Sequence, residues 1–388
     1  MRHLGPLLVT LAVLPTLLTA QDDSASRYPN TAGEHTWGGV TIFTDQDLLD
    51  PWRNMDRNYT MGVGAGVTGA AFSEWPLGKL ERTLLGWFHP TISETSTYIT
   101  KHDLLLVGNG FTPDSLGAVD PVVGDRPYGS IFGFSARRLV VPRRLRARQG
   151  RPPIAYYPEA FRTELVVGGL GVGVGAWVQT KIHENNSSVV PLGWHNEISD
   201  GGEPTFLARV HYERRLFACG MEGQSCGHPS LHAPRNFEAT TFAEAMVGYY
   251  GNVASGLRAR LGWITSEFWD FDGTPLGSIA QAGGREASGP NKVEFFFFGG
   301  IQGRAVAWNT LLHGQFKSNP YEIAYSDVEH VIGEFQAGFA LNFPLWGNWK
   351  FGTGWIYQGR TAEFVGIHAR THTYASAFVT VTKTPSLR

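Results

Sequence analysis

Apolar and polar-or-small residues alternate with period two along several long segments of the chain. In residues 59–67 one row is apolar, while the other row carries Thr60 and three glycines. Residues 206–215, 253–261 and 331–343 repeat the pattern, with charged or amide side chains in the polar row. Successive side chains of a strand point to opposite faces of a sheet. The alternation therefore predicts strands whose two faces meet different surroundings.

Twelve segments fit a strand, and an even number suits a closed antiparallel barrel with both chain ends on one side. We expect these strands at residues 38–46, 58–69, 97–109, 128–141, 160–171, 206–218, 237–250, 253–265, 292–308, 327–343, 348–360 and 371–383. With both chain ends in the periplasm, the outer loops fall near 47–57, 110–127, 172–205, 251–252, 309–326 and 361–370.

Two folds produce this alternation, a soluble β-sandwich and a membrane barrel. The segments run to ~10 residues or more, the length of a tilted membrane strand, whereas soluble strands have ~5–6. Aromatic residues also gather at strand ends, as Trp346, Trp349, Tyr249 and Phe343 do, which is typical of an interfacial girdle. The predicted fold class is an all-β transmembrane antiparallel barrel of about 12 strands.

Composition agrees with this fold. Charged residues are 17% of the 388, below the roughly 25% of a typical globular chain, yet the mean hydropathy is only −0.15. Beyond the N-terminus no run approaches the ~18 apolar residues of a membrane helix, which excludes a helical membrane protein. Interleaved apolar and polar rows explain both observations.

The first twenty residues have the pattern of a secretory signal. Arg2 and His3 precede an apolar run from Leu4 to Leu18, and Thr19-Ala20 forms a small-residue end. We therefore expect a signal peptide at 1–20, a barrel domain at 21–388 and a location in the bacterial outer membrane. The formal net charge of −2 gives no indication of a nucleic-acid partner.

Cys219 and Cys226 flank a Gly-rich turn. In an exported chain a local disulfide is the expected state of such a pair. The alternative, a metal pair, lacks two further ligands at suitable spacing.

A basic run follows the fourth expected strand and comprises Arg143, Arg144, Arg146, Arg148 and Arg151. It has two interpretations, a clamp for anionic lipopolysaccharide or a solvated turn. The strand order places it in an inner turn, on the periplasmic side, which favours the solvated turn.

Residues 172–186 interrupt the alternation, and their second half predicts a short helix in an outer loop. Gln179 and His183 are four residues apart and so share one helical face. A histidine is suited to general-base catalysis because its ordinary pKa is near 6.5. A solvated loop histidine is the alternative.

Asp45 and Thr60 belong to the first two strands. Thr60 is in the polar row, so we expect it to face the lumen near the outer rim. Asp45 begins a group of acids with Asp47, Asp50 and Asp56. Such carboxylates suit either a calcium site or a solvated acidic loop. Neither a G-x-S-x-G elbow nor an H-E-x-x-H motif occurs.

At these residues the chain resembles the LpxR-type outer-membrane lipid A 3′-O-deacylases. The similar segments run in family order through nearly the whole mature sequence. They are 56–62 (DRNYTMG), 112–113 (TP), 124–129 (GDRPYG), Gln179 with His183 and then 193–194 (GW), 212–214 (YER), 251–252 (GN) and 303–306 (GRAV).

The resemblance implies a twelve-stranded barrel that removes the 3′ acyloxyacyl chain from lipid A, with calcium, by a phospholipase-A2-like route. It implies that His183 is the base and that Gln179 supports it. By the same resemblance, Thr60 and calcium would stabilise the oxyanion. Asp45 stands at the position of the family's metal-binding Asp.

Two positions near the expected metal site depart from the family. Thr44 stands where the family has Asn, and Val189 stands where it has a Glu that contributes to the metal site. Glu184 and Glu197 are the nearby candidates to replace that carboxylate.

Three functions thus follow from the sequence. The first is a lipid A deacylase that acts on lipopolysaccharide, expected to be a monomer. The second is an esterase that uses the same residues on outer-membrane phospholipid. The third is a non-catalytic structural barrel or pore.

Overall fold

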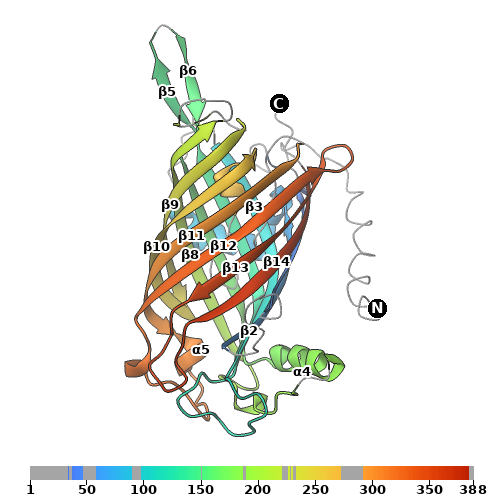
Figure 1. Ribbon diagram of the computed structural model, residues 1–388, viewed down its shortest axis with the longest axis vertical. Coiled ribbons are helices and arrows are strands. Elements are labelled where there is room, and N and C mark those ends of the chain that lie inside the picture. Colours follow the sequence, from blue (N-terminus) through green and yellow to red (C-terminus); the bar gives the residue numbers. More distant parts are fainter. Residues whose placement is uncertain are drawn as a thin grey trace.

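The computed structural model describes residues 34, 37–46, 58–89, 98–149, 151–186, 189–220, 226, 227, 229, 233–271 and 292–383. Within these residues, twelve antiparallel strands close into a barrel (Figure 1). The strands are β1 (Gly39–Gln46), β2 (Asn58–Thr68), β3 (Tyr98–Thr112), β4 (Gly129–Pro142), β7 (Glu159–Leu170), β8 (Glu203–Gly220), β9 (Arg235–Gly248), β10 (Tyr250–Ile264), β11 (Glu294–Asn309), β12 (Val331–Pro344), β13 (Trp349–Arg360) and β14 (His372–Lys383).

Strand β1 pairs with both β2 and β14, which closes the barrel. The predicted fold and the twelve predicted strands are confirmed, with boundaries that differ by a few residues. We call the end where β1 begins and β14 ends the terminal end, and the opposite end the loop end.

The two faces of the wall differ as the alternation predicts. Leu257 and Phe297 point outward and are half exposed, as expected for a surface that lipid covers. The inward face is lined by charged side chains and by an apolar cluster that includes Phe43 and Leu105. The apolar residues are thus divided between the lipid-facing surface and part of the lumen.

Ion pairs fill much of the lumen. Arg304 Nε lies 2.9 Å from Glu334, and Arg304 Nη1 lies 3.3 Å from Glu244, which also pairs with Arg209. Arg360 bonds to the other oxygen of Glu334. Because buried charges are stable only when they are paired, this ladder holds the inner faces of neighbouring strands together.

We expected the basic run to form a simple turn. The structure instead has a two-stranded hairpin there, made of β5 (Arg144–Arg148) and β6 (Arg151–Tyr156). The two strands of the hairpin pair with each other and not with the barrel. In the barrel wall, β4 pairs directly with β7. Figure 1 shows the hairpin projecting beyond the wall at the terminal end.

Cys219 and Cys226 form a disulfide, with an S–S distance of 2.02 Å, so the expected disulfide is confirmed. Residues 1–20, the expected signal peptide, lie outside the described residues.

Helices occupy several connections. The predicted helix is present as α4 (Val174–Asn186). The others are η3 (Ala70–Glu74), α3 (Pro76–Leu85), η4 (Gly86–Phe88), η5 (Trp194–Asn196), η6 (Phe268–Asp270), α5 (Thr310–His313) and η7 (Tyr325–Asp327). Among the described helices, none combines the length and apolar character needed to cross a bilayer.

Candidate functional site

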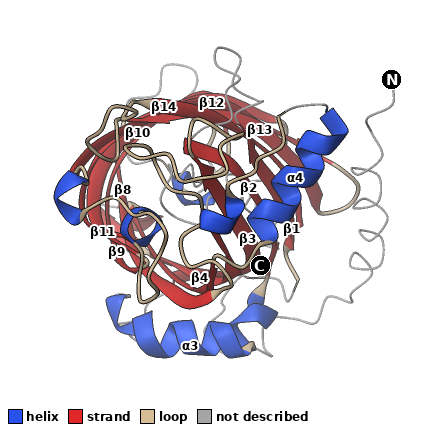
Figure 2. Cartoon of the chain, turned by 90° about the horizontal axis from the view of Figure 1, so that it is seen from below, coloured by secondary structure: helices blue, strands red, loops and turns tan. Residues whose placement is uncertain are grey.

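Helix α4 lies outside the ring of strands at the loop end (Figures 1 and 2). The chain reaches it from β7 through Gly171 and Gly173, whose φ angles are +59° and +73°. A side chain at Gly171 would also meet the backbone oxygen of Ser199 at 2.2 Å. Only glycine suits that position, so the local sequence turns the chain out of the wall and into the helix.

Gln179 and His183 are both buried. The indole Nε1 of Trp194 donates to Gln179 Oε1 over 2.7 Å. His183 Nδ1 lies 2.6 Å from the carbonyl oxygen of Val189. The structure therefore brings the two predicted residues together on one helix, as their spacing predicted, and each has a defined polar contact.

The contact at Val189 assigns the tautomer of His183. A carbonyl oxygen can only accept, so Nδ1 carries the hydrogen. In the neutral ring the lone pair is then on Nε2, the nitrogen that can take a proton. The side chain of Val189 is exposed. The residue that stands where the family has Glu thus acts here through its backbone.

Trp194 is held between the loops and the outer wall. Its ring lies 4.9 Å from that of Tyr128, between centroids. It also lies near the outer side of Gly110 and beside Gly175 of α4. A side chain at Gly193 would clash with the Tyr128 ring at 2.6 Å. The Gly-Trp pair of the sequence is therefore the packing element that seats α4 against the barrel.

Glu197 is a buried carboxyl group beside this packing. Ser130 Oγ donates to its Oε2 over 2.8 Å. Burial raises the pKa of Glu197 to about 7; the Ser130 hydrogen bond opposes the shift and the nearby Asp200 adds to it. Glu184, the other candidate to replace the family carboxylate, is exposed and pairs with Lys181 over 2.6 Å.

Asp45 is fully buried in β1. Strand alternation puts it on the same face as Phe43, which belongs to the lumen cluster. Thr60 lies at an irregularity in the β2–β3 pairing, between Tyr59 and Met61. Its side chain is outside the described residues, so its expected lumen orientation stays a prediction. Helix α4, in contrast, lies outside the ring of strands.

The expected calcium site is not assembled by the described residues. They contain no group of three or more His, Cys, Asp or Glu side chains that could hold a metal. Asp47, Asp50 and Asp56, the other acids of the predicted site, lie outside the described residues. Calcium therefore stays a prediction, and no chemical step below depends on it.

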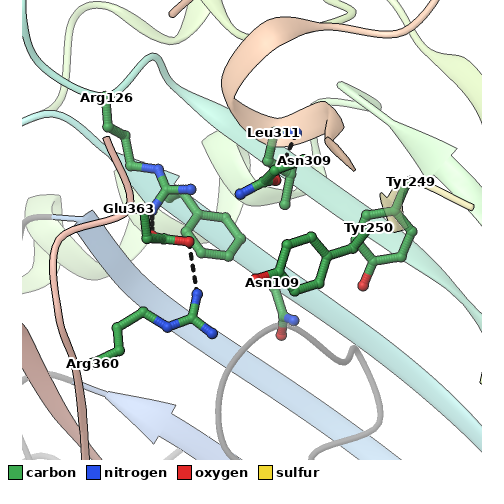
Figure 3. A pocket seen from close by; sticks show the side chains of 9 residues that line it. Asn109, Arg126, Tyr249, Tyr250, Asn309, Leu311, Arg360 and Glu363 are labelled. Atoms are coloured by element: carbon green, nitrogen blue, oxygen red, sulfur yellow. Dashed lines mark hydrogen bonds and ion pairs between the residues drawn. The ribbon is translucent and has the colours of Figure 1, made fainter. Parts of the chain in front are cut away.

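The GDRPYG segment contributes Arg126 to a different place, a small pocket that Figure 3 shows from close by. Arg126 Nη1 and Arg360 Nη1 each lie 2.7 Å from Glu363. Burial opposes ionisation of Glu363, but the two arginines outweigh it and lower its pKa to about 2. Asn109, Phe111, Tyr250 and Leu311 line the same small pocket. This cluster joins the loop residues Arg126 and Glu363 to Arg360 at the end of β13.

The family model described as "Outer membrane protein LpxR" matches residues 7–382. This chain belongs to the LpxR family of outer-membrane proteins. No protein of curated function matches the chain in sequence.

Among solved structures, LpxR from Salmonella typhimurium is 14% identical to this LpxR-family chain, with a TM-score of 0.60. That match covers 88% of this chain and 99% of the Salmonella protein, and it shows the shared fold. The beta domain of the Bordetella autotransporter BrkA matches at 10% identity over 90% of this chain and 99% of that one, with a TM-score of 0.40.

Sequence reasoning missed part of the site. In the sequence Trp194 is only the second residue of a Gly-Trp motif, and no spacing pairs it with Gln179. Ser130 has no local sequence signal either. It is 67 residues from Glu197, and that contact depends on how the loop folds back on the wall.

Proposed function

We propose that this LpxR-family protein hydrolyses an acyl ester of lipid A, the 3′ chain by resemblance, with His183 as the general base. The observation that carries the proposal is the bond from His183 Nδ1 to the Val189 carbonyl, because it leaves Nε2 as the basic nitrogen. The position of α4 supports it as well. A site outside the wall at the loop end suits a substrate that lies in the surrounding leaflet rather than in the lumen.

The reaction follows from this geometry. His183 Nε2 removes a proton from a water molecule while the water oxygen attacks the ester carbonyl carbon. The tetrahedral intermediate then collapses, and the imidazolium returns the proton to the departing alkoxide oxygen. The products are a free fatty acid and a hydroxyl on the lipid A part. The Val189 carbonyl stabilises the imidazolium through Nδ1–H.

Gln179 acts as the donor to the developing oxyanion. Since Trp194 holds its Oε1, the amide hydrogens have a fixed direction. Thr60 is proposed as a second donor by resemblance alone. Calcium would stabilise the same negative charge if the first outer loop binds it. Addition of a chelator to the purified protein tests that part separately.

The test of the proposal is acyl release from lipid A by the full-length protein in detergent. Wild type, His183→Ala and the matched control His195→Ala are compared by mass spectrometry; His195 is exposed two residues beyond the Gly193 turn. Loss of activity in the first variant only is expected. A parallel reaction on phosphatidylethanolamine separates a lipid A deacylase from an esterase for phospholipid.

A non-catalytic barrel is the second candidate, and two substitutions favour it. Val189 and Thr44 replace the Glu and Asn that the resemblance places near the metal. Under this candidate wild type releases no fatty acid from either lipid, and added calcium does not change its thermal stability.

A further inference from the structure

Helix α3, with the short helices η3 and η4, forms a second element outside the wall. It follows β2 directly, so it lies at the terminal end, opposite to α4. Its contacts are with β4 and β7. Figure 2, which looks along the barrel, shows α3 lengthwise beside the ring of strands. The helix axis therefore runs across the wall, roughly parallel to the plane that a membrane around the barrel would have.

The side of α3 that faces the barrel carries Gly78, Glu81 and Leu85. Glu81 is buried and accepts a hydrogen bond from Thr163 Oγ1, which is also 2.7 Å from His89 Nε2. Thr163 is on the outer face of β7, because its neighbour Glu164 points into the lumen and bonds to Ser135 there. These bonds attach the middle of the helical segment, at Glu81, and the residue after it, His89, to the wall.

The apolar side of α3 faces away from the barrel. Trp75, Leu80, Leu84, Trp87 and Phe88 are 47%, 44%, 49%, 73% and 38% exposed. A helix of a soluble protein buries its large apolar side chains, whereas this segment leaves five of them exposed. A contiguous apolar surface of this kind marks an interaction site.

This surface continues the lipid-facing wall. The three strands beneath or beside α3 carry Leu106 of β3, Phe134 of β4 and Val167 of β7 on their outer faces, all exposed. Lys79 and Arg82 are near the apolar face, where they pair with Glu74. Tryptophan, leucine and basic residues together are typical of helices that lie at a membrane interface.

We propose that η3, α3 and η4 form an interfacial anchor that inserts Trp75, Leu80, Leu84, Trp87 and Phe88 into the phospholipid leaflet at the terminal end. With the chain ends in the periplasm, this is the inner leaflet of the outer membrane. The barrel thereby contacts the two leaflets through different exterior helices, with α4 on the lipid A side and α3 on the phospholipid side. The anchor does not depend on the proposed hydrolysis.

The test uses spin labels on single introduced cysteines. Both native cysteines are disulfide-bonded, so a label reacts only at the new site. Leu84→Cys and Trp87→Cys probe the anchor, and the exposed Leu80→Cys replaces either one that fails to fold. Phe134→Cys is the lipid control. Leu145→Cys, exposed in the β5–β6 hairpin, is the aqueous control. Folding is checked by heat-dependent gel mobility.

Each protein is reconstituted in vesicles of phosphatidylethanolamine and phosphatidylglycerol, and collision of the label with oxygen and with a water-soluble nickel chelate is measured. We expect the Leu84 and Trp87 labels to behave like the Phe134 label, with high oxygen collision and nickel collision several-fold below that at Leu145. Nickel collision equal to that at Leu145 would overturn the proposal. Low collision with both reagents would also overturn it, since the face would then be covered by protein.

Discussion

The ring of His183 donates from Nδ1 to the carbonyl oxygen of Val189 across 2.6 Å. This backbone contact gives the histidine a defined tautomer. Its first consequence concerns Val189. Val189→Ala keeps the carbonyl and removes only an exposed side chain, so lipid A hydrolysis should stay within about twofold of wild type. A loss as large as the 10²–10⁴-fold typical of a missing general base would show that the side chain matters.

Trp194 orients Gln179, and this can be tested without changing Gln179. Trp194→Phe keeps an aromatic ring at this position, although a smaller one, and removes the Nε1 donor, so the amide loses its fixed direction. We expect kcat to fall about tenfold, the effect of losing roughly 1.4 kcal/mol in the transition state, with little change in KM. Trp177→Phe is the control, because Trp177 is on the same helix and exposed. Equal effects of the two variants would mean that Trp194 only packs.

Glu197 should make stability depend on pH. Its pKa rises from 4.5 to about 7 on folding, so between these values the folded protein binds more protons than the unfolded chain. The contribution of protonated Glu197 to the free energy of unfolding is therefore fully present below about pH 4.5 and is lost as the pH rises through 7. The loss is on the order of 3 kcal/mol, since each pKa unit is worth about 1.4 kcal/mol.

Glu197→Gln removes this titration. Urea unfolding in detergent micelles at pH 4.5 and pH 8 should show a smaller pH difference for the variant than for wild type. A difference of the same size in both proteins would contradict the assignment to Glu197.

The period-two pattern made the barrel predictable, because the two faces of a strand are a local property. Gln179 and His183 were predicted for the same reason, since four residues make one helical turn. Contacts such as Trp194 with Gln179 and Ser130 with Glu197 depend on a loop folding against the outer wall. Alternation says nothing about that step, so it could not place α4 outside the barrel.

Helix α3 was missed for a related reason. It is short, begins with Pro76 and contains Gly78, so it gives a weak helical signal. Its exposed apolar residues face away from the barrel, and none of them lies in a predicted strand. The basic run was likewise assigned to a turn, because nothing in its sequence distinguishes a solvated turn from a solvated hairpin.

Glu334 is central to the lumen ladder, since it bonds to both Arg304 and Arg360. Glu334→Gln removes the countercharge that Arg304 and Arg360 share and leaves each arginine with one carboxylate partner, Glu244 and Glu363 respectively. We expect a loss of about 3–5 kcal/mol in the free energy of unfolding. The control Glu184→Gln breaks an exposed pair with Lys181 and should cost less than about 1 kcal/mol. Urea titrations that give the two variants similar stability would contradict the ladder's role.

The most direct test of the account is the mass spectrum of lipid A after incubation with wild type, His183→Ala and His195→Ala. We expect wild type and His195→Ala to yield a lipid A that has lost one acyl group, with the matching free fatty acid. His183→Ala should leave the lipid intact while it still folds as a barrel. Acyl release that survives in His183→Ala would contradict the central claim, that this histidine is the base.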